Sequence, residues 1–243
     1  MNKKKAIKYS KDFIIADGHI DLPFRLNKEG LLFKKNINLN NETSGNFDIP
    51  KAKRGGLDCP FMAIYIPSEK LEDEAYSFAN SLIDLVKNTI KYNDQLAPAL
   101  SPTQVIKNFN NDKISLPMGI ENGSAIGKNL KNLNHFFNRG IRYVTLTHAK
   151  NNQICDSSYD TNKKWNGLSD FGKIGNYATR QIIRWEKQWH LSKQRELPEM
   201  QKIIDWLNNN IPEGDEMIAY TTLIGGGETV VVEFTAPDAG EYD

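Results

Sequence analysis

Short apolar runs alternate with amphipathic stretches over the first 150 residues. The runs carry few charged residues, as expected for strands buried in a parallel sheet, and they lie at 13–16, 60–67, 114–123 and 142–148. Apolar residues recur at helical spacing over 70–92, and shorter helices are predicted at 101–109 and 129–138. Residues 24–58 are polar, rich in Asn and predicted to be loop-like. The alternation of strands and helices predicts an α/β fold with a parallel sheet.

Side chains suited to metal binding or acid/base chemistry stand at the ends of three of these four runs. His19 and Asp21 follow the first run, Glu121 lies near the end of the third, and His148 ends the fourth. Because the carboxyl ends of parallel strands meet at one edge of a sheet, these side chains are expected to converge there. In extended chain His19 and Asp21 point to the same side, so both can reach one cation. A His-x-Asp pair alone is more often a capping or hydrogen-bonded pair, so the recurrence at strand ends is what favours a site.

Composition narrows the class of protein. The chain has 243 residues, of which 39% are hydrophobic and 25% charged, as in soluble globular proteins with one large or two small domains. A net charge of +1 gives no reason to expect nucleic acid as a partner. No apolar run approaches the roughly 18 residues of a membrane span. The basic start is followed by too few apolar residues for an export signal, and Cys59 and Cys155 lack CxxC spacing, so a cytoplasmic location is expected.

Five stretches carry a resemblance to a known family. They occur in order over residues 13–173: DGHIDLP, FDIPKAKRGG, PMGIENGSAIG, RGIRYVTLTHAKNN and WNGLSDFGK. Together they resemble the renal (membrane) dipeptidase family of zinc peptidases. The resemblance implies a TIM-type (β/α)8 barrel, of which residues 1–173 would form about half.

The resemblance also implies roles for individual residues. His19 and Asp21 would hold one zinc ion, Glu121 would bridge two, and His148 would contact the dipeptide substrate as a catalytic residue. Two cations that share a carboxylate can activate a water molecule and polarise the carbonyl of the scissile bond. The resemblance thus implies hydrolysis of a dipeptide bond.

The histidine count limits this expectation. The family's second zinc needs two further histidines from later strands, but after His148 the chain contains only His190, on a predicted helix. One zinc ion is therefore expected, and the dipeptidase site is expected to be incomplete in this chain. The alternative is a non-catalytic composite or truncated protein that binds at most one metal. A mononuclear amidohydrolase ranks last, because such enzymes typically open with His-x-His.

The last 70 residues predict two further modules. Residues 174–213 are expected to form two helices separated near Pro198, and they resemble a segment of aminoglycoside-phosphotransferase-like kinases. Residues 214–243 contain acidic but no basic residues, predict a β-hairpin around the triplet Gly225 to Gly227, and resemble part of an azurin- or auracyanin-like cupredoxin. Neither segment holds the catalytic or copper ligands of those proteins. The chain is therefore interpreted as a composite whose half-barrel has an open sheet edge, which a second copy, in a homodimer, or the C-terminal segments could cover.

Overall fold

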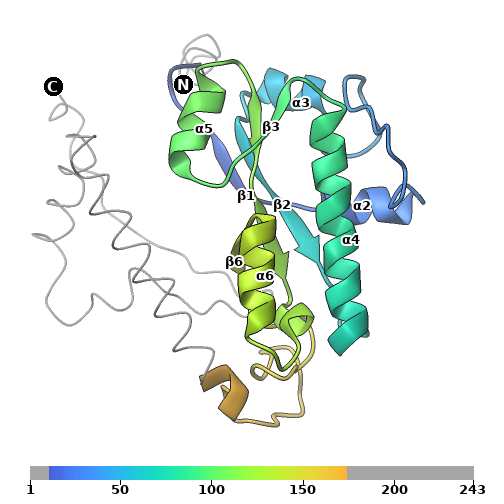
Figure 1. Ribbon diagram of the computed structural model, residues 1–243, viewed down its shortest axis with the longest axis vertical. Helices are drawn as coiled ribbons and strands as arrows, with labels where there is room; N and C mark the ends of the chain where they lie inside the picture. Colours follow the sequence, from blue (N-terminus) through green and yellow to red (C-terminus); the bar gives the residue numbers. More distant parts are fainter. Residues whose placement is uncertain (1–10, 174–243) are drawn as a thin grey trace, which may run out of the picture. The chain divides into compact units, whose positions relative to one another are not determined.

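The computed structural model describes residues 11–173, which form an α/β unit (Figure 1). In chain order its elements are β1 (Ala16–Ile20), α2 (Leu22–Lys28), α3 (Ile49–Gly55), β2 (Cys59–Tyr65), α4 (Glu72–Lys91), β3 (Leu96–Pro98), α5 (Pro102–Phe109), β4 (Ile114–Leu116), β5 (Met118–Glu121), the 3-10 helix η1 (Gly123–Ile126), α6 (Lys131–Arg139) and β6 (Ile141–Val144). The predictions for 174–213 and 214–243 lie outside the described residues.

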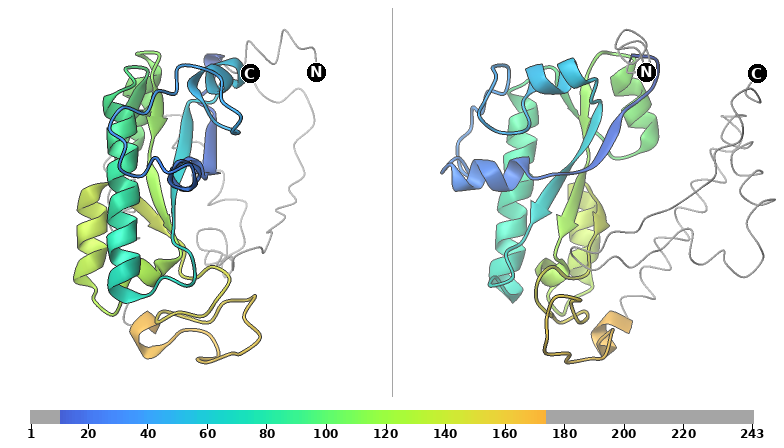
Figure 2. Two further views of the ribbon diagram at one scale, coloured as in Figure 1. Left: turned by 90° about the vertical axis from the view of Figure 1, so that its right-hand side faces the viewer. Right: turned by 180° about the vertical axis from the view of Figure 1, so that it is seen from behind.

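A parallel sheet of four strands organises this unit. The strand order is β1-β2-β5-β6, and each neighbouring pair is parallel. Strands β3 and β4 form a separate parallel pair. Helices α4 and α6 lie on the same side of the four-stranded sheet (Figure 2). The predicted α/β fold with a parallel sheet is confirmed, whereas its assignment to about half of a TIM-type (β/α)8 barrel stays a prediction.

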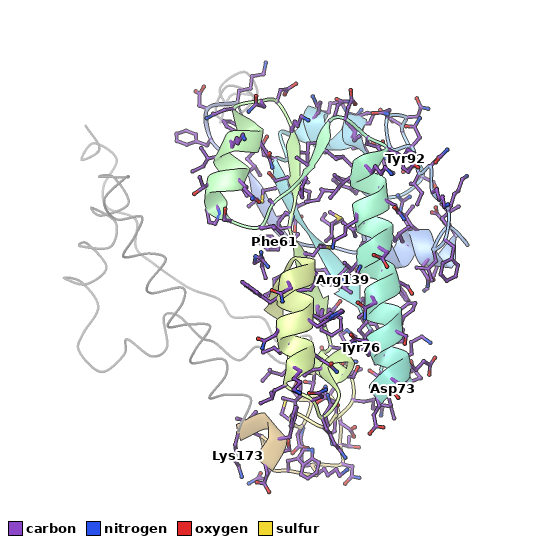
Figure 3. All side chains as sticks on the ribbon, in the orientation of Figure 1. Phe61, Asp73, Tyr76, Tyr92, Arg139 and Lys173 are labelled. Atoms are coloured by element: carbon purple, nitrogen blue, oxygen red, sulfur yellow. The ribbon has the colours of Figure 1, made fainter. Side chains whose placement is uncertain are left out.

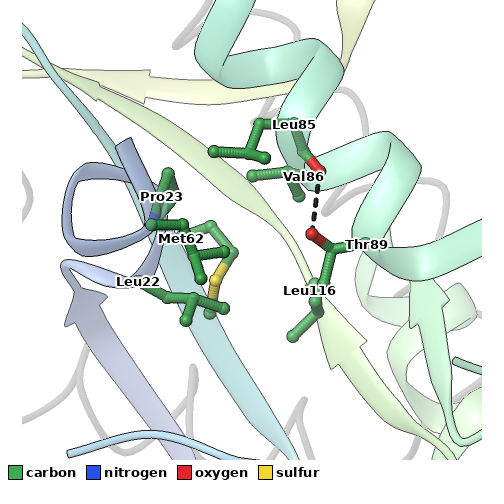
Figure 4. A pocket seen from close by; sticks show the side chains of 8 residues that line it. Leu22, Pro23, Met62, Leu85, Val86, Thr89 and Leu116 are labelled. Atoms are coloured by element: carbon green, nitrogen blue, oxygen red, sulfur yellow. Dashed lines mark hydrogen bonds between the residues drawn. The ribbon is translucent and has the colours of Figure 1, made fainter. Parts of the chain in front are cut away.

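The core lies between α4 and the sheet. The predicted helix at 70–92 is confirmed as α4, whose buried side includes Leu82, Leu85 and Val86. Figure 4 shows Leu85 and Val86 facing Met62 of β2, with Leu22 and Leu116 completing the apolar contact. Each fully buried side chain of this size contributes roughly 1.5–3 kcal/mol. This packing holds β2, the strand between β1 and β5, in place.

Contacts between α4 and α6 fix the two helices to each other. The Arg139 guanidinium donates a hydrogen bond of 2.6 Å to Oδ1 of Asn80, and Nε2 of His135 lies 2.8 Å from the same oxygen. The Tyr76 ring packs against Phe136 with a centroid distance of 5.3 Å, and Figure 3 shows Tyr76 and Arg139 on these helices. His135 therefore has a packing role in this helix pair.

The predicted strand boundaries were wrong at three places. The first strand is β1 rather than 13–16, and most of its residues are exposed because β1 pairs only with β2 within the described part of the chain. The third run splits at Pro117, which has no N–H for a ladder, so that β4 pairs with β3 while β5 joins the main sheet. The fourth strand, β6, ends at Val144, before His148.

Two helices occupy the stretch that was predicted to be loop-like. In α3, the Asp48 side chain accepts a hydrogen bond of 2.9 Å from the Lys51 N–H, and Pro50 sits in the first turn. Pro23 takes a similar early position in α2. An Asp followed two residues later by Pro is a helix start signal, so α3 was predictable from the sequence.

Asp48 is fully buried and anchors the segment before α3. It also accepts a 2.8 Å hydrogen bond from the Thr43 N–H and lies 2.9 Å from the Lys51 ammonium. Burial alone raises the pKa of Asp48, but the N–H donors of Thr43 and Lys51 and the Lys51 charge outweigh it and hold that pKa well below its ordinary range. Its stabilisation is therefore present above about pH 4 and is lost as the pH falls further.

Replacing this carboxylate should destabilise the fold. We expect Asp48→Asn to lower the free energy of unfolding by about 1–3 kcal/mol at pH 7, because the amide cannot accept all these bonds. The difference from wild type should narrow below about pH 4, as measured by urea denaturation. Asp112→Asn is the control, since Asp112 is exposed and pairs with Lys53 at 2.8 Å. Equal losses in the two variants would contradict the role of Asp48.

Candidate metal centre

Three of the predicted site residues converge at the carboxyl edge of the sheet. His19, Asp21 and Glu121 each offer one ligand atom, and these atoms lie within 4.8 Å of one another. Nε2 of His19 is 3.5 Å from Oδ1 of Asp21 and 3.3 Å from Oε2 of Glu121. Within residues 11–173 this is the one group of three such side chains.

The strands place these three residues. His19 lies within β1, and Asp21 follows it at the start of α2. In the described chain the Asp21 carboxylate does not cap that helix, and it is 61% exposed. Glu121 is the last residue of β5 and is only 18% exposed. Because β2 pairs in parallel with both β1 and β5, it sets the spacing between His19 and Glu121.

His148 reaches the same carboxylate from the other side. Its Nε2 lies 3.4 Å from Oε1 of Glu121, whereas His19 contacts Oε2. The other ring nitrogen of His148, Nδ1, is buried and has no hydrogen-bond partner among the described residues. The backbone carbonyl of His148 accepts a hydrogen bond from the Ser157 hydroxyl, which holds the loop after β6. The structure therefore brings all four predicted site residues together.

The charges at the centre favour a cation. The hydrogen bonds to Asp21 and then to Glu121 raise the pKa of His19 to about 10, against an opposing effect of burial. The contact with His19 in turn lowers the pKa of Asp21. In the metal-free protein at neutral pH, a protonated His19 thus supplies the positive charge that the two carboxylates attract.

Sequence reasoning missed two residues beside the centre. Tyr65 ends β2 opposite Glu121, and its ring packs edge-on against His148 with a centroid distance of 5.0 Å. Its position at a strand end is the same signal that identified the other residues, so it could have been found. Asn122 follows Glu121 and has a φ of 78°. The only signal for it in the sequence is that Asn adopts positive φ more often than most residues do.

The comparisons with known proteins decide the family. The membrane dipeptidase family (peptidase family M19) matches residues 3–175. The chain belongs to this family. The resemblance found in the sequence is thereby confirmed over that stretch. The resemblances to a kinase segment and to a cupredoxin segment, which concern residues outside the described part, stay predictions.

Individual relatives agree with this assignment. Dipeptidase 3 of Mus musculus is 26% identical over 175 residues, covering 70% of this chain and 35% of the relative. Dipeptidase ataJ of Aspergillus terreus is 32% identical over 172 residues, covering 65% of this chain and 40% of the relative. The chain therefore spans about a third to two fifths of the length of these curated relatives.

Solved structures share the fold. A metallopeptidase from Rhodobacter sphaeroides, liganded with a phosphinate mimic of the dipeptide L-Ala-D-Ala, aligns with a TM-score of 0.60 at 20% identity. The alignment covers 70% of this chain and 56% of that chain. The probable dipeptidase PvdM from Pseudomonas aeruginosa aligns with a TM-score of 0.62 at 20% identity, over 74% of this chain and 48% of that chain. Among the described helices, none combines the length and apolar character of a membrane span.

The elevated pKa of His19 can be measured directly. In the metal-free protein, with EDTA present, the His19 ring should titrate near pH 10 in an NMR titration. Asp21→Asn and Glu121→Gln should each bring its pKa down toward 6.5, because each removes one hydrogen-bonding carboxylate. The accompanying stabilisation is complete below about pH 6.5 and is lost as the pH rises through about 10.

Asp17→Asn serves as the control for this titration. Asp17 lies on the same strand as His19, and its replacement by Asn removes one negative charge, as Asp21→Asn does. The Asp17 carboxylate, however, accepts a hydrogen bond from the His19 backbone N–H rather than from the ring. This variant should leave the pKa of His19 close to that of wild type. A wild-type His19 that titrates near 6.5 would contradict the described geometry.

Proposed function

We propose that this chain binds a zinc ion through His19, Asp21 and Glu121 and contributes to the hydrolysis of dipeptides. The observation that carries the proposal is the convergence of these three ligand atoms within 4.8 Å at the carboxyl edge of the parallel sheet. Membership of the membrane dipeptidase family gives the substrate class. A fold of this kind places catalytic groups at that edge.

The donor set fits a zinc ion. Two carboxylates and one imidazole are ordinary zinc ligands, and three protein ligands leave a position for water or substrate. The partly exposed Asp21 gives access from solvent, and the protonated His19 of the metal-free protein marks the place where positive charge is stabilised. A divalent cation held there would lower the pKa of a water molecule and polarise a peptide carbonyl.

His148 has the geometry of a residue that contacts substrate. Glu121 and the edge of the Tyr65 ring orient its imidazole, and about a third of the side chain is exposed. Nε2 contacts Oε1 of Glu121 in the metal-free protein, and it would be released when that carboxylate binds a metal ion. Its N–H would then donate to the carbonyl of the scissile bond and stabilise developing negative charge. Tyr65 would keep the ring in this orientation by packing against it.

A second candidate function is binding of one metal ion without catalysis. It is favoured by the ligand count, because residues 11–173 contain one group of three ligands. The chain spans 35% and 40% of the two curated relatives described above. The two candidates agree on the metal ligands and differ only in turnover.

Loss of the shared carboxylate should weaken zinc binding strongly and abolish turnover. We expect the wild-type chain to bind one zinc ion in a calorimetric titration and to hydrolyse unblocked dipeptides. Loss of a residue that hydrogen-bonds to a metal ligand lowers metal affinity roughly 10- to 100-fold. Glu121→Gln removes a ligand itself, so it should weaken zinc binding by more than this. The control Glu74→Gln removes an exposed carboxylate on α4 that pairs with Lys70.

The results separate the candidates. One zinc ion per chain with hydrolysis supports the dipeptidase, and one ion without hydrolysis supports the non-catalytic metal binder. Absence of zinc binding, or unchanged binding in Glu121→Gln, would contradict both.

Zinc affinity should also depend on pH in a specific way. Binding to His19 must displace the proton that its raised pKa retains, so the association constant should increase about tenfold per pH unit from pH 6.5 to 8.5. A histidine with an ordinary pKa would give a plateau above about pH 7.5. Chelator-buffered zinc titrations at several pH values measure this slope. A plateau in that range would show that His19 is not the displaced group.

A further inference from the structure

Asn122 combines a strained backbone with a buried polar side chain directly after Glu121. Its φ and ψ are 78° and 101°, a region that residues other than glycine rarely adopt, and the residue is only 2% exposed. Such a conformation persists only when the surrounding contacts enforce it, and it is concentrated at functional sites. The contacts of Asn122 are therefore informative.

Four hydrogen bonds connect Asn122 to three parts of the fold. Its Nδ2 donates to the Ile66 carbonyl after β2 at 2.9 Å, and its backbone N–H donates to Oγ1 of Thr145 after β6 at 3.0 Å. Its Oδ1 accepts from the Ser124 N–H in η1 at 3.2 Å and from Nδ2 of Asn152 at 3.1 Å. Through its backbone N–H and its side chain together, Asn122 thus joins the ends of β2 and β5 to the chain that follows β6.

These bonds act on both sides of the candidate metal centre. Asn152 also donates to the Leu146 carbonyl at 2.7 Å, so the chain that leads to His148 is tied to Asn122 twice, through Thr145 and through Asn152. The Ile66 N–H donates to the Glu121 carbonyl at 3.0 Å, which closes the link between β2 and Glu121. Asn122 therefore lies at the junction that relates Glu121 to His148.

We propose that Asn122 is a positioning residue that, through these hydrogen bonds, holds the Glu121 carboxylate between His19 and His148. The positioning of the Glu121 carboxylate is inferred from the metal-free protein alone, whereas its consequence for metal binding rests on the proposed function. The side chain does more than tolerate the backbone conformation, because its amide supplies three of the four bonds.

Histidine ring NMR tests the positioning in the metal-free full chain. Asn122→Gly keeps access to positive φ and removes the amide, so a purely conformational role predicts a wild-type spectrum. We expect instead that the ring resonances of His19 and His148 shift, while that of His135, between α4 and α6, does not. His→Gln variants assign the resonances. Wild-type shifts of His19 and His148 in Asn122→Gly would overturn the proposal.

Asn93→Ala is the matched control. Asn93 is also a buried Asn, donates to the carbonyls of Ile37 and Thr89 at 2.7 Å each, and accepts from the Leu39 N–H at 3.0 Å. It should destabilise the fold without moving the His19 or His148 resonances. If it moves them as much as Asn122→Gly does, the effect is general destabilisation and the proposal is wrong.

Two further measurements complete the test. If Asn122→Gly does not fold, Thr145→Val is the second variant: it removes the acceptor of the Asn122 N–H, together with the long 3.5 Å hydrogen bond that the Thr145 hydroxyl donates to the Ile120 carbonyl. Shifted His19 and His148 resonances would then support the proposal, and unshifted ones would overturn it. With cobalt as the probe, Asn122→Gly should weaken binding about 10- to 100-fold and change the visible spectrum, whereas Asn93→Ala should do neither. A wild-type chain that binds no cobalt would contradict the proposed function, while the NMR result would still decide the role of Asn122.

Discussion

The candidate site depends on one carboxylate that two imidazoles share. Glu121 offers Oε2 to His19 and Oε1 to His148, so residues from β1, from β5 and from the loop after β6 meet at one side chain. A carboxylate can do this because its two oxygens accept in different directions, whereas an imidazole has one free lone pair. Asp21 adds a second negative charge. The two carboxylates together stabilise a positive charge between them, which is why the pKa of His19 is raised.

The rest of the described fold keeps that carboxylate in place. Strand β2 pairs with β1 and β5, and α4 packs against β2 with an apolar face, so the spacing of the ligands follows from the sheet and its core. Beyond the strand ends, close contacts between loop segments also position the site. Gly123 approaches the Leu146 carbonyl so closely that a Cβ there would lie 2.9 Å from it, which brings the loop toward His148 up against the end of β5.

Much of the site could be predicted from the sequence, because strand ends in a parallel sheet share one edge. The positions of Glu121 and His19 follow from that rule even though the first strand was placed too early. That error arose because the apolar run that ends at Ala16 looked like a buried strand, whereas the ladder with β2 runs from Ala16 to Ile20. The break at Pro117 was also readable, because proline has no N–H for a ladder. Asn122 shows the limit: its network joins residues that are far apart in the sequence, so it depends on tertiary contacts that local patterns do not contain.

The most direct test of the metal centre is a crystal structure of the zinc-loaded chain with anomalous diffraction recorded on both sides of the zinc absorption edge. The account predicts an anomalous peak bounded by Nε2 of His19 and the carboxylates of Asp21 and Glu121, at about 2.0–2.2 Å from each ligand atom. A zinc peak elsewhere in the chain, or none with these three side chains still in contact, would contradict it.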